Sequence, residues 1–205
     1  MENRKVSSRV LQTRQALEKA LLEMMAEHNL EQLTVKELCE RAGIHKQTFY
    51  RHYQDLNEFI VSFRERAAAA LVEEFSDLKL PEDLAELNRR LFLMVEDGGP
   101  AVEKLLNSES YHYLLERLSY AFLQPLWMKS PWFVSLSEAE QRLILRWIFS
   151  TGSSFYVQWL RDGRLLPPEQ AIALSSQLLC QGLGVSLATD PVPATLPTPV
   201  IHEKS

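Results

Sequence analysis

The sequence predicts an all-α protein, with a small N-terminal three-helix domain followed by a larger helical C-terminal domain. Apolar residues recur at intervals of three and four along most of the chain, which is the spacing of amphipathic helices. Gly and Pro residues separate these stretches, and none of them alternates in the manner of a strand. Residues 34–53 contain two short amphipathic segments joined by Ala42-Gly43-Ile44, which predicts a helix-turn-helix.

Length and composition are those of a folded protein. The 205 residues are enough for one large or two small domains, and 46% of them are hydrophobic. We place the N-terminal domain at residues 1–54 and the C-terminal domain at residues 55–187. Residues 188–205 are rich in Pro and polar residues, so a disordered tail is expected there.

The first helix of the helix-turn-helix is predicted to begin after Thr34. The Thr34 hydroxyl can cap this helix, while Glu37, three residues later, can reach back to the cap. Gly43 provides the permissive backbone that a tight exit requires. A preceding helix from Arg14 to His28 completes the three-helix domain.

The second helix of the pair has one side to bury and one side to expose. Phe49 and Tyr53 lie one turn apart and form the apolar side. On a helical projection, Gln47 and Arg51 point almost directly away from Phe49. These two polar side chains are therefore expected to face solvent.

The exposed side of this second helix carries groups suited to the major groove of DNA. Gln pairs with adenine and Arg with guanine, while Lys, Thr and Tyr bind phosphate oxygens. The exposed residues of these types are Lys46, Gln47, Thr48, Tyr50 and Arg51. Double-stranded DNA is the expected partner, and the alternative is the solvated face of an ordinary helical bundle.

Four short segments follow the first helix in a fixed order and spacing. They are Leu33-Thr34-Val35, Ala42-Gly43-Ile44, Thr48-Phe49-Tyr50 and Leu56-Asn57-Glu58-Phe59. This pattern, within residues 13–63, resembles the DNA-binding domain of the TetR family of bacterial transcriptional regulators. It covers about a quarter of the chain. The helical remainder is compatible with the regulatory and dimerisation domain that such proteins carry.

The resemblance implies a role for each matched position. Phosphate contacts are implied for Thr34, Lys46, Tyr50 and His52, and base contacts for Gln47, Thr48 and Arg51. Two positions depart from the usual pattern. His45 stands where the family commonly has a capping Ser, and it is still counted among the expected DNA-contacting residues. Leu56 stands where the family commonly has a Lys at the start of the fourth helix. Loss of that Lys removes a phosphate contact, which lowers affinity unless other charges compensate.

The net charge of −5 is unevenly distributed along the chain. Residues 1–66 carry 11 basic and 10 acidic side chains, whereas the remainder carries 11 basic and 17 acidic ones. The slight positive balance of the first part fits a DNA-binding domain. Arg4, Lys5, Arg9 and Arg14 are expected to form a flexible basic arm that supplies the missing charge.

No motif indicates catalysis, a cofactor or membrane insertion, so a cytoplasmic protein that is not an enzyme is expected. The sequence lacks a Gly-rich phosphate loop, a Gly-x-Ser-x-Gly elbow and a His-Glu-x-x-His pair. No metal is expected either. The residues that could be imagined as a metal cluster are Cys39, His28, His45 and His52, and their spacing is not that of a metal site. No apolar run reaches membrane-spanning length, and the N-terminus lacks an apolar signal region.

Apolar periodicity and capping residues predict five helices beyond the helix-turn-helix. Ser137 and Glu140 form a capping box at the start of one of them, and Gly163 ends that helix. Gly98-Gly99-Pro100 is expected to break the chain between two others. The predicted helices span residues 55–78, 81–97, 111–128, 137–162 and 169–187.

The last two predicted helices have more apolar surface than one core contact requires. The helix at 137–162 is apolar on more than one side, and small residues in both helices would allow another helix to approach. We therefore expect a homodimer with a four-helix interface. The residues expected in this interface are Ile148, Gly152, Phe155, Trp159, Leu178 and Gly182. The alternative is a helix that is simply central in a monomer.

The leading interpretation is a TetR-type transcriptional regulator, expected to be a repressor. It would bind a near-palindromic operator as a homodimer and be released by a small-molecule effector that moves the helix at 55–78. The alternative has no small-molecule effector and is controlled by a protein partner or acts as a co-activator. An effector would be apolar or amphipathic, although the aromatic residues of the C-terminal domain more often form core than a binding site. No effector-binding residue can be named.

Overall fold

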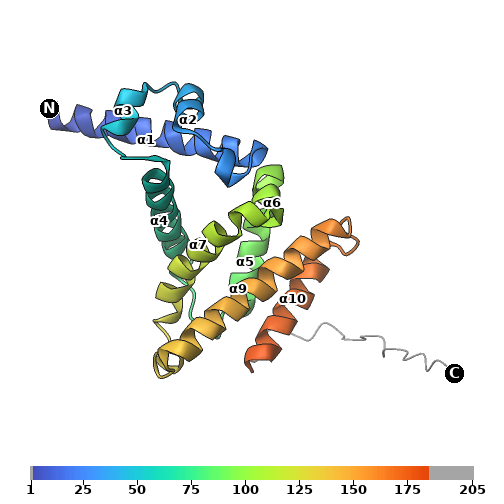
Figure 1. The fold of residues 1–205 in the computed structure, drawn as a ribbon. Helices are drawn as coiled ribbons and strands as arrows, with labels where there is room; N and C mark the ends of the chain where they lie inside the picture. Colours follow the sequence, from blue (N-terminus) through green and yellow to red (C-terminus); the bar gives the residue numbers. More distant parts are fainter. Residues whose placement is uncertain (1, 185–205) are drawn as a thin grey trace.

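The computed structural model describes residues 2–184, with the side chains of residues 2–8, 100 and 101 left out (Figure 1). The predicted tail at 188–205 and the end of the last predicted helix lie outside the described residues. In chain order the elements are α1 (Glu2–Glu27), the 3₁₀ turn η1 (Leu30–Gln32), α2 (Val35–Ala42), α3 (Lys46–Tyr50), α4 (Leu56–Glu74), α5 (Leu84–Asp97), α6 (Gly99–Asn107), α7 (Glu109–Trp127), α8 (Pro131–Val134), α9 (Glu138–Arg161) and α10 (Pro168–Leu183). The described residues contain no strand, so the predicted all-α class is confirmed.

Helices α1 to α3 form one end of the molecule, and α5, α7, α9 and α10 form the other, with α4 running between the two parts (Figure 1). Helix α1 is longer than predicted, because it begins at Glu2 instead of Arg14. The expected flexible arm is therefore wrong for the described residues of that segment. They continue the helix backbone.

The core of the N-terminal domain extends beyond the boundary predicted at residue 54. Phe59 and Ile60 from the first turns of α4 belong to the same buried cluster as the residues of α1 to α3. Leu105 of α6 and Tyr111 of α7 also belong to this cluster. The two domains therefore share buried apolar contacts in addition to the connecting helix α4.

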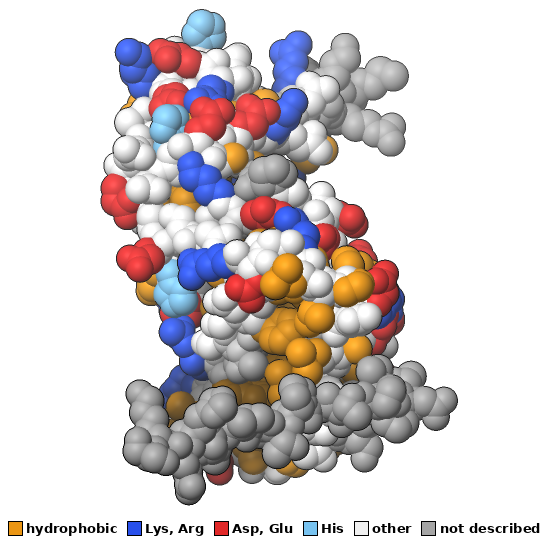
Figure 2. Space-filling model, turned by 90° about the vertical axis from the view of Figure 1, so that its right-hand side faces the viewer, with side chains coloured by type: hydrophobic (Ala, Val, Ile, Leu, Met, Phe, Trp, Pro, Cys, Tyr) orange, Lys and Arg blue, Asp and Glu red, His pale blue; other side chains and the backbone are white. Residues whose placement is uncertain are grey.

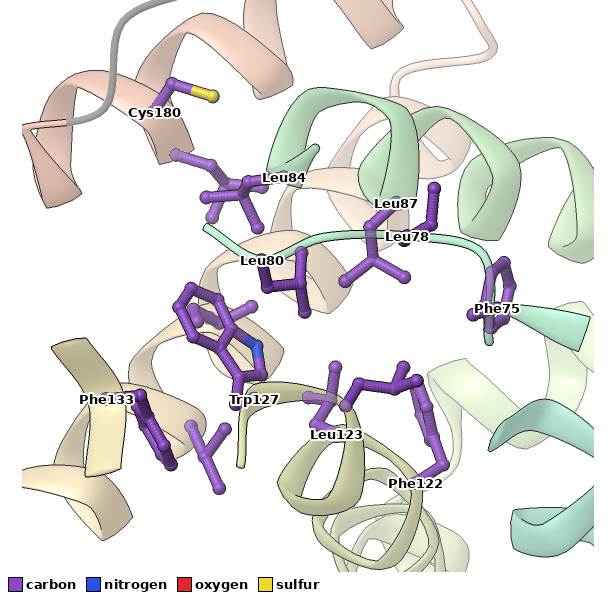
Figure 3. Packing of buried hydrophobic residues seen from close by; sticks show 14 of the residues in the cluster. Phe75, Leu78, Leu80, Leu84, Leu87, Phe122, Leu123, Trp127, Phe133 and Cys180 are labelled. Carbon is purple, nitrogen blue, oxygen red and sulfur yellow. The ribbon is translucent and has the colours of Figure 1, made fainter. Parts of the chain in front are cut away.

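The core of the C-terminal domain is centred on Trp127, which is fully buried. Figure 3 shows Trp127 among apolar side chains from the α4–α5 connection, α7 and α8. Its ring centroid lies 5.5 Å from that of Phe133 in α8. Aromatic rings at this separation pack as they do in well-ordered cores.

Two short helices were missed in the sequence. The Gly98-Gly99-Pro100 segment does end α5, but the chain continues at once into α6, because Pro is tolerated in the first turn of a helix. Pro131 opens α8 in the same way, and the Ser130 hydroxyl caps that helix by accepting a hydrogen bond from Phe133 N at 3.4 Å. The predicted capping box of Ser137 and Glu140 is confirmed at the start of α9.

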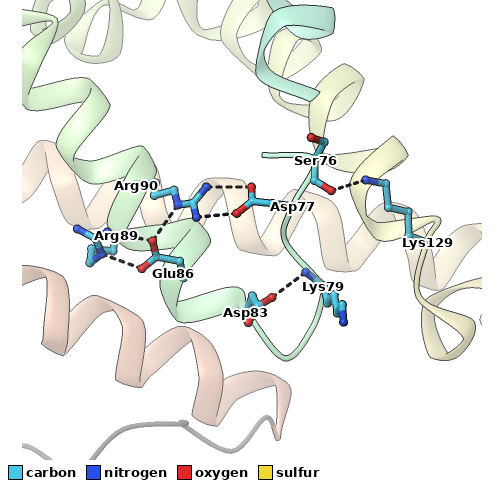
Figure 4. Close-up of polar contacts among 8 residues, drawn as sticks. All are labelled: Ser76, Asp77, Lys79, Asp83, Glu86, Arg89, Arg90 and Lys129. Carbon is cyan, nitrogen blue, oxygen red and sulfur yellow. Dashed lines mark hydrogen bonds and ion pairs between the residues drawn. The ribbon is translucent and has the colours of Figure 1, made fainter. Parts of the chain in front are cut away.

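A polar network holds the connection between α4 and α5 (Figure 4). Arg90 donates hydrogen bonds to both carboxylate oxygens of Asp77, at 3.0 and 2.8 Å, and to Glu86 at 2.8 Å. Arg89 donates two further hydrogen bonds to Glu86. The paired guanidinium groups hold the pKa of Glu86 down at about 2.

None of the helices formed by residues 2–184 combines the length and the apolar character that crossing a bilayer requires.

Candidate nucleic-acid interface and internal cavity

The turn between α2 and α3 forms as its sequence predicts. The Thr34 hydroxyl caps α2 by accepting a hydrogen bond from Glu37 N at 3.2 Å. Gly43 has a φ of 66°, the left-handed conformation that favours Gly and lets the chain turn directly into α3. The reciprocal half of the predicted capping box is absent among the described contacts, because the Glu37 carboxylate instead accepts a hydrogen bond from Arg41 at 2.9 Å.

Helix α3 is anchored through Phe49, whose side chain is completely buried. The Phe49 ring lies 5.5 Å from Tyr53 and 5.9 Å from Phe59, measured between ring centroids. Gln47 and Arg51 are exposed on the other side of the helix. This is the orientation that the helical projection predicts.

The structure brings the predicted DNA-contacting residues to one end of the molecule and leaves most of them accessible. Thr48 is half-buried and the others are exposed, namely Thr34, His45, Lys46, Gln47, Tyr50, Arg51 and His52. His45 occupies the N-cap of α3, but its side chain makes no capping hydrogen bond.

Lys46 and Arg51 differ from Arg41 of α2 in whether their charges are paired. Arg41 is paired with Glu27 at 2.5 Å and with Glu37 at 2.9 Å, and its hydrogen bond lowers the pKa of Glu27. Within the described part of the chain, Lys46 and Arg51 make no ion pair or side-chain hydrogen bond. Their charges are therefore available to an external anion such as DNA phosphate.

Leu56, which replaces the Lys common in the family, packs half-buried against the core of the N-terminal domain. The start of α4 is instead capped by Asp55, which accepts a hydrogen bond from Glu58 N at 2.8 Å. No group of three potential metal ligands occurs among the described residues, and Cys39 is buried in the apolar core.

Several residues expected in a dimer interface face the interior of their own protomer. Ile148 and Trp159 are buried in the apolar cores of the C-terminal domain, and half-buried Phe155 packs beside Trp159. Gly152 lies beside Asn88 in the lining of a cavity, where a Cβ atom on Gly152 would be 4.0 Å from Asn88 Oδ1. The most apolar stripe of α9 is thus already covered by α7, by α10 and by Phe92 of α5, which corrects the expected role of these residues.

Gly182 also makes its close contact within its own protomer. A Cβ atom at this position would lie 2.5 Å from Cη2 of Trp147 in α9, so the glycine makes room for that ring. The large apolar side chains that remain exposed on α9 and α10 are Leu143, Trp147 and Leu178. Figure 2 views the side on which α9 and α10 lie, and it shows hydrophobic side chains gathered in the lower part of the molecule.

The C-terminal domain contains a partly open cavity of about 230 Å³ that sequence reasoning did not locate. Its walls come mainly from α5, α6, α7 and α9 and are almost entirely apolar. The polar residues in the lining are Asn88, Ser119, Ser153 and Tyr156. The aromatic and Met side chains of the C-terminal domain have different environments. Phe92, Met94 and Phe122 line the cavity, Trp127 and Trp159 are buried in the core, and Tyr120 and Trp147 are exposed.

Helix α6 lies between this cavity and the N-terminal domain. Leu105 belongs both to the cavity wall and to the core shared with α1. Next to it, Tyr111 donates a hydrogen bond to the His28 carbonyl oxygen at 2.7 Å, and Leu30 N donates one to Ser110 Oγ at 2.7 Å. Burial raises the pKa of Tyr111 to about 12, so its phenol remains a donor at neutral pH.

Comparisons with known proteins agree with this architecture. A family model described as bacterial regulatory proteins, tetR family, matches residues 18–60. The uncharacterized HTH-type transcriptional regulator YxbF of Bacillus subtilis (strain 168) is 23% identical over 176 residues. This alignment covers 82% of the chain but only 44% of that relative, so the chain spans less than half of its length.

Two solved structures share the fold at low sequence identity. The SmeT–triclosan complex has a TM-score of 0.60 at 16% identity, covering 88% of this chain and 99% of the other. The regulator FadR from Bacillus subtilis in complex with stearoyl-CoA has a TM-score of 0.59 at 17% identity, covering 82% and 98%. The matched family model and the helix-turn-helix geometry identify the N-terminal part of the chain as a DNA-binding domain of the TetR family of bacterial transcriptional regulators, and the solved structures show that the chain shares its overall fold with two such regulators.

Proposed function

We propose that this regulator binds a near-palindromic operator as a homodimer, represses transcription there, and is released by a small-molecule effector. The observation that carries the proposal is the orientation of α3. Phe49 holds its apolar side in the core, while Gln47 and Arg51 project into solvent. An exposed helix with amide and guanidinium groups is suited to reading bases, and Lys46 beside them is suited to binding phosphate.

Binding to DNA fragments from upstream of its own gene tests the reading surface. We expect Arg51→Ala to relax specificity by about 1–3 kcal/mol at one base pair, because a bidentate contact to that base is lost. We expect Lys46→Ala to weaken binding to all DNA sites, because one phosphate contact is lost. The slope of the logarithm of the binding constant against the logarithm of the salt concentration should fall by about one. Lys79→Ala, which removes the same charge from the exposed α4–α5 connection, is the control. If both α3 variants bind like this control, the assigned surface is wrong.

The exposed apolar side chains on α9 and α10 support self-association. Leu143, Trp147 and Leu178 leave apolar area in water that a second copy of the chain would cover. A two-fold interface would place two α3 helices on one face of DNA, and this geometry selects a near-palindromic site. Sedimentation should give a dimer at micromolar concentration and a monomer for Leu178→Glu. A monomeric wild-type protein would contradict this part of the proposal.

The cavity supports control by a small molecule. It lies against α6, and α6 in turn packs on α1, so a ligand that changes the position of α6 would change the placement of the reading helix. Leu71 of α4 also lines the cavity, which links it to the helix that connects the domains. FadR and SmeT were solved with stearoyl-CoA and triclosan, respectively.

A second candidate keeps the DNA-binding role without a small-molecule effector. Control would then come from a protein partner, or the protein would act as a co-activator. Transcription from the upstream promoter, measured with and without the protein, separates repression from activation. A cavity-filling variant that leaves every regulatory response unchanged would favour this second candidate.

A further inference from the structure

The cavity contains no group that could neutralise an ionised ligand. No Lys, Arg, His, Asp or Glu occurs in its lining. Arg164 is paired with Glu96, the carboxylate that accepts a hydrogen bond from Tyr156, and with Glu103. Burying an unpaired carboxylate or ammonium group in such an environment is strongly unfavourable. An uncharged ligand is therefore favoured.

The orientation of the Asn88 amide is fixed by its neighbours on α10. The Ser175 hydroxyl donates its proton to the Ile172 carbonyl oxygen at 3.0 Å, so toward Asn88 it can only accept. Asn88 Nδ2 accordingly donates to Ser175 Oγ at 2.8 Å and to Ser176 Oγ at 3.0 Å. The amide oxygen must then point the other way, toward Gly152 and the cavity.

In the described part of the chain Asn88 takes part in hydrogen bonds only as a donor through Nδ2, so its Oδ1 has no protein donor. The hydroxyl protons in the rest of the lining are already engaged. Ser119 donates to the Leu115 carbonyl oxygen, Ser153 to that of Ser150, and Tyr156 to the Glu96 carboxylate. The cavity therefore presents acceptors, chiefly Asn88 Oδ1, and few available donors.

We propose that the cavity binds a small, uncharged, largely apolar molecule whose hydroxyl group donates a hydrogen bond to Asn88 Oδ1, as an alcohol or a phenol would. The volume of about 230 Å³ lies just below the range of drug-sized ligand sites, which favours a compact molecule. The regulatory meaning of this inference rests on the proposed function, whereas the binding itself can be tested without DNA.

Two matched probe series test the chemistry of the ligand on the full chain. The first contains 4-propylphenol, its methyl ether 4-propylanisole, and 4-propylbenzoate. The second contains octan-1-ol, 1-methoxyoctane and octanoate. In at least one series, calorimetry should show the hydroxyl compound binding about tenfold more tightly than its ether, because the ether leaves the buried acceptor unpaired. The carboxylate should bind more weakly still. A carboxylate or ether that binds as tightly as its hydroxyl counterpart, or the absence of binding in both series, overturns the proposal.

Two variants in the lining of the cavity test where the ligand binds. Asn88→Leu should reduce the tenfold preference for the hydroxyl compound to less than about twofold, an effect that general destabilisation would not produce. Gly152→Leu places a bulky apolar side chain in the cavity beside Asn88 Oδ1, since a Cβ on Gly152 would lie 4.0 Å from that atom. This variant should lose all probe binding. Asn57→Leu, an exposed helical Asn on α4, is the matched control and should behave like wild type. An unchanged preference in Asn88→Leu would overturn the assignment.

Operator binding measured with each probe separates this inference from the proposed function. If a hydroxyl probe binds with the expected preference but leaves the affinity for DNA unchanged, the ligand class stands and the effector role fails. If a carboxylate binds most tightly and releases DNA, the effector role stands and the ligand class fails.

Discussion

The N-terminal and C-terminal domains are both helical, but they are packed differently. In the first, Leu17, Leu38 and Phe49 are completely buried, and no residue before α4 contributes to the cavity. In the second, α5, α6, α7 and α9 line a partly open cavity of about 230 Å³. A tightly packed domain holds exposed side chains in fixed positions, whereas a hollow one can respond to what fills it. The difference in packing thus fits the proposed division of function, in which the N-terminal domain binds DNA and the C-terminal domain binds a ligand.

Replacing one aromatic residue in each domain tests this difference most strongly. Phe49→Ala should lower the free energy of unfolding by about 3–5 kcal/mol, because a fully packed ring leaves a new void. Phe122→Ala should cost less, about 2–3 kcal/mol, because this ring borders the existing cavity and has fewer neighbours to lose. Urea unfolding followed by circular dichroism measures both values. Equal losses would show that the two domains are packed alike.

Two helical glycines should respond in opposite directions. Gly182→Ala should destabilise the protein by about 1–3 kcal/mol, because the new Cβ would collide with the Trp147 ring. Gly152→Ala should stabilise it by up to about 1 kcal/mol, because the cavity accepts the methyl group and Ala favours a helix. Thermal unfolding shows whether each variant is more or less stable than the wild type, and Trp fluorescence should change mainly in the Gly182 variant. The same sign for both would contradict the described geometry.

The contact between the domains should contribute a smaller amount. Tyr111→Phe removes the hydrogen bond to the His28 carbonyl oxygen and should cost about 1 kcal/mol. Tyr113→Phe, at an exposed position two residues away, is the control and should have no effect. Unfolding curves in urea provide the comparison. If the two variants are equally stable, the Tyr111 hydroxyl does not hold the domains together.

The smallest expected effect concerns the polar network between α4 and α5. Because the folded state lowers the pKa of Glu86 from 4.5 to about 2, its contribution is complete above the unfolded value and is lost as the pH falls toward about 2. The side chain is about one third exposed, so the contribution should stay below about 1 kcal/mol. Glu86→Gln should flatten the acid limb of the stability profile, while Glu82→Gln, an exposed neighbour, should not. A Glu86 variant with an unchanged profile would argue against this network.

The local features of the helix-turn-helix could be predicted because neighbouring residues determine them. The cap at Thr34, the turn at Gly43 and the buried side of Phe49 all follow from spacing within a few residues. Helix α6 was missed because Gly98-Gly99-Pro100 indicates a break, and the same Pro also suits the first turn of a new helix.

The features that depend on distant residues could not be predicted. The sequence shows that α9 is apolar on more than one side, but it does not show which side its own protomer covers. Ile148 and Trp159 were therefore assigned to an interface although they are core. The cavity is formed by side chains from several helices far apart in the chain, and whether such side chains close on each other or leave a void depends on the detail of their packing.

The position of Leu105 limits how this protein can be redesigned as a biosensor. Because the residue belongs both to the cavity lining and to the core of the N-terminal domain, changing it to admit a new compound would also disturb the packing of that domain. Ser119, Phe122 and Gly152 line the cavity from α7 and α9 without joining that second core. Libraries aimed at new inducers should therefore vary these three positions and keep Leu105 constant.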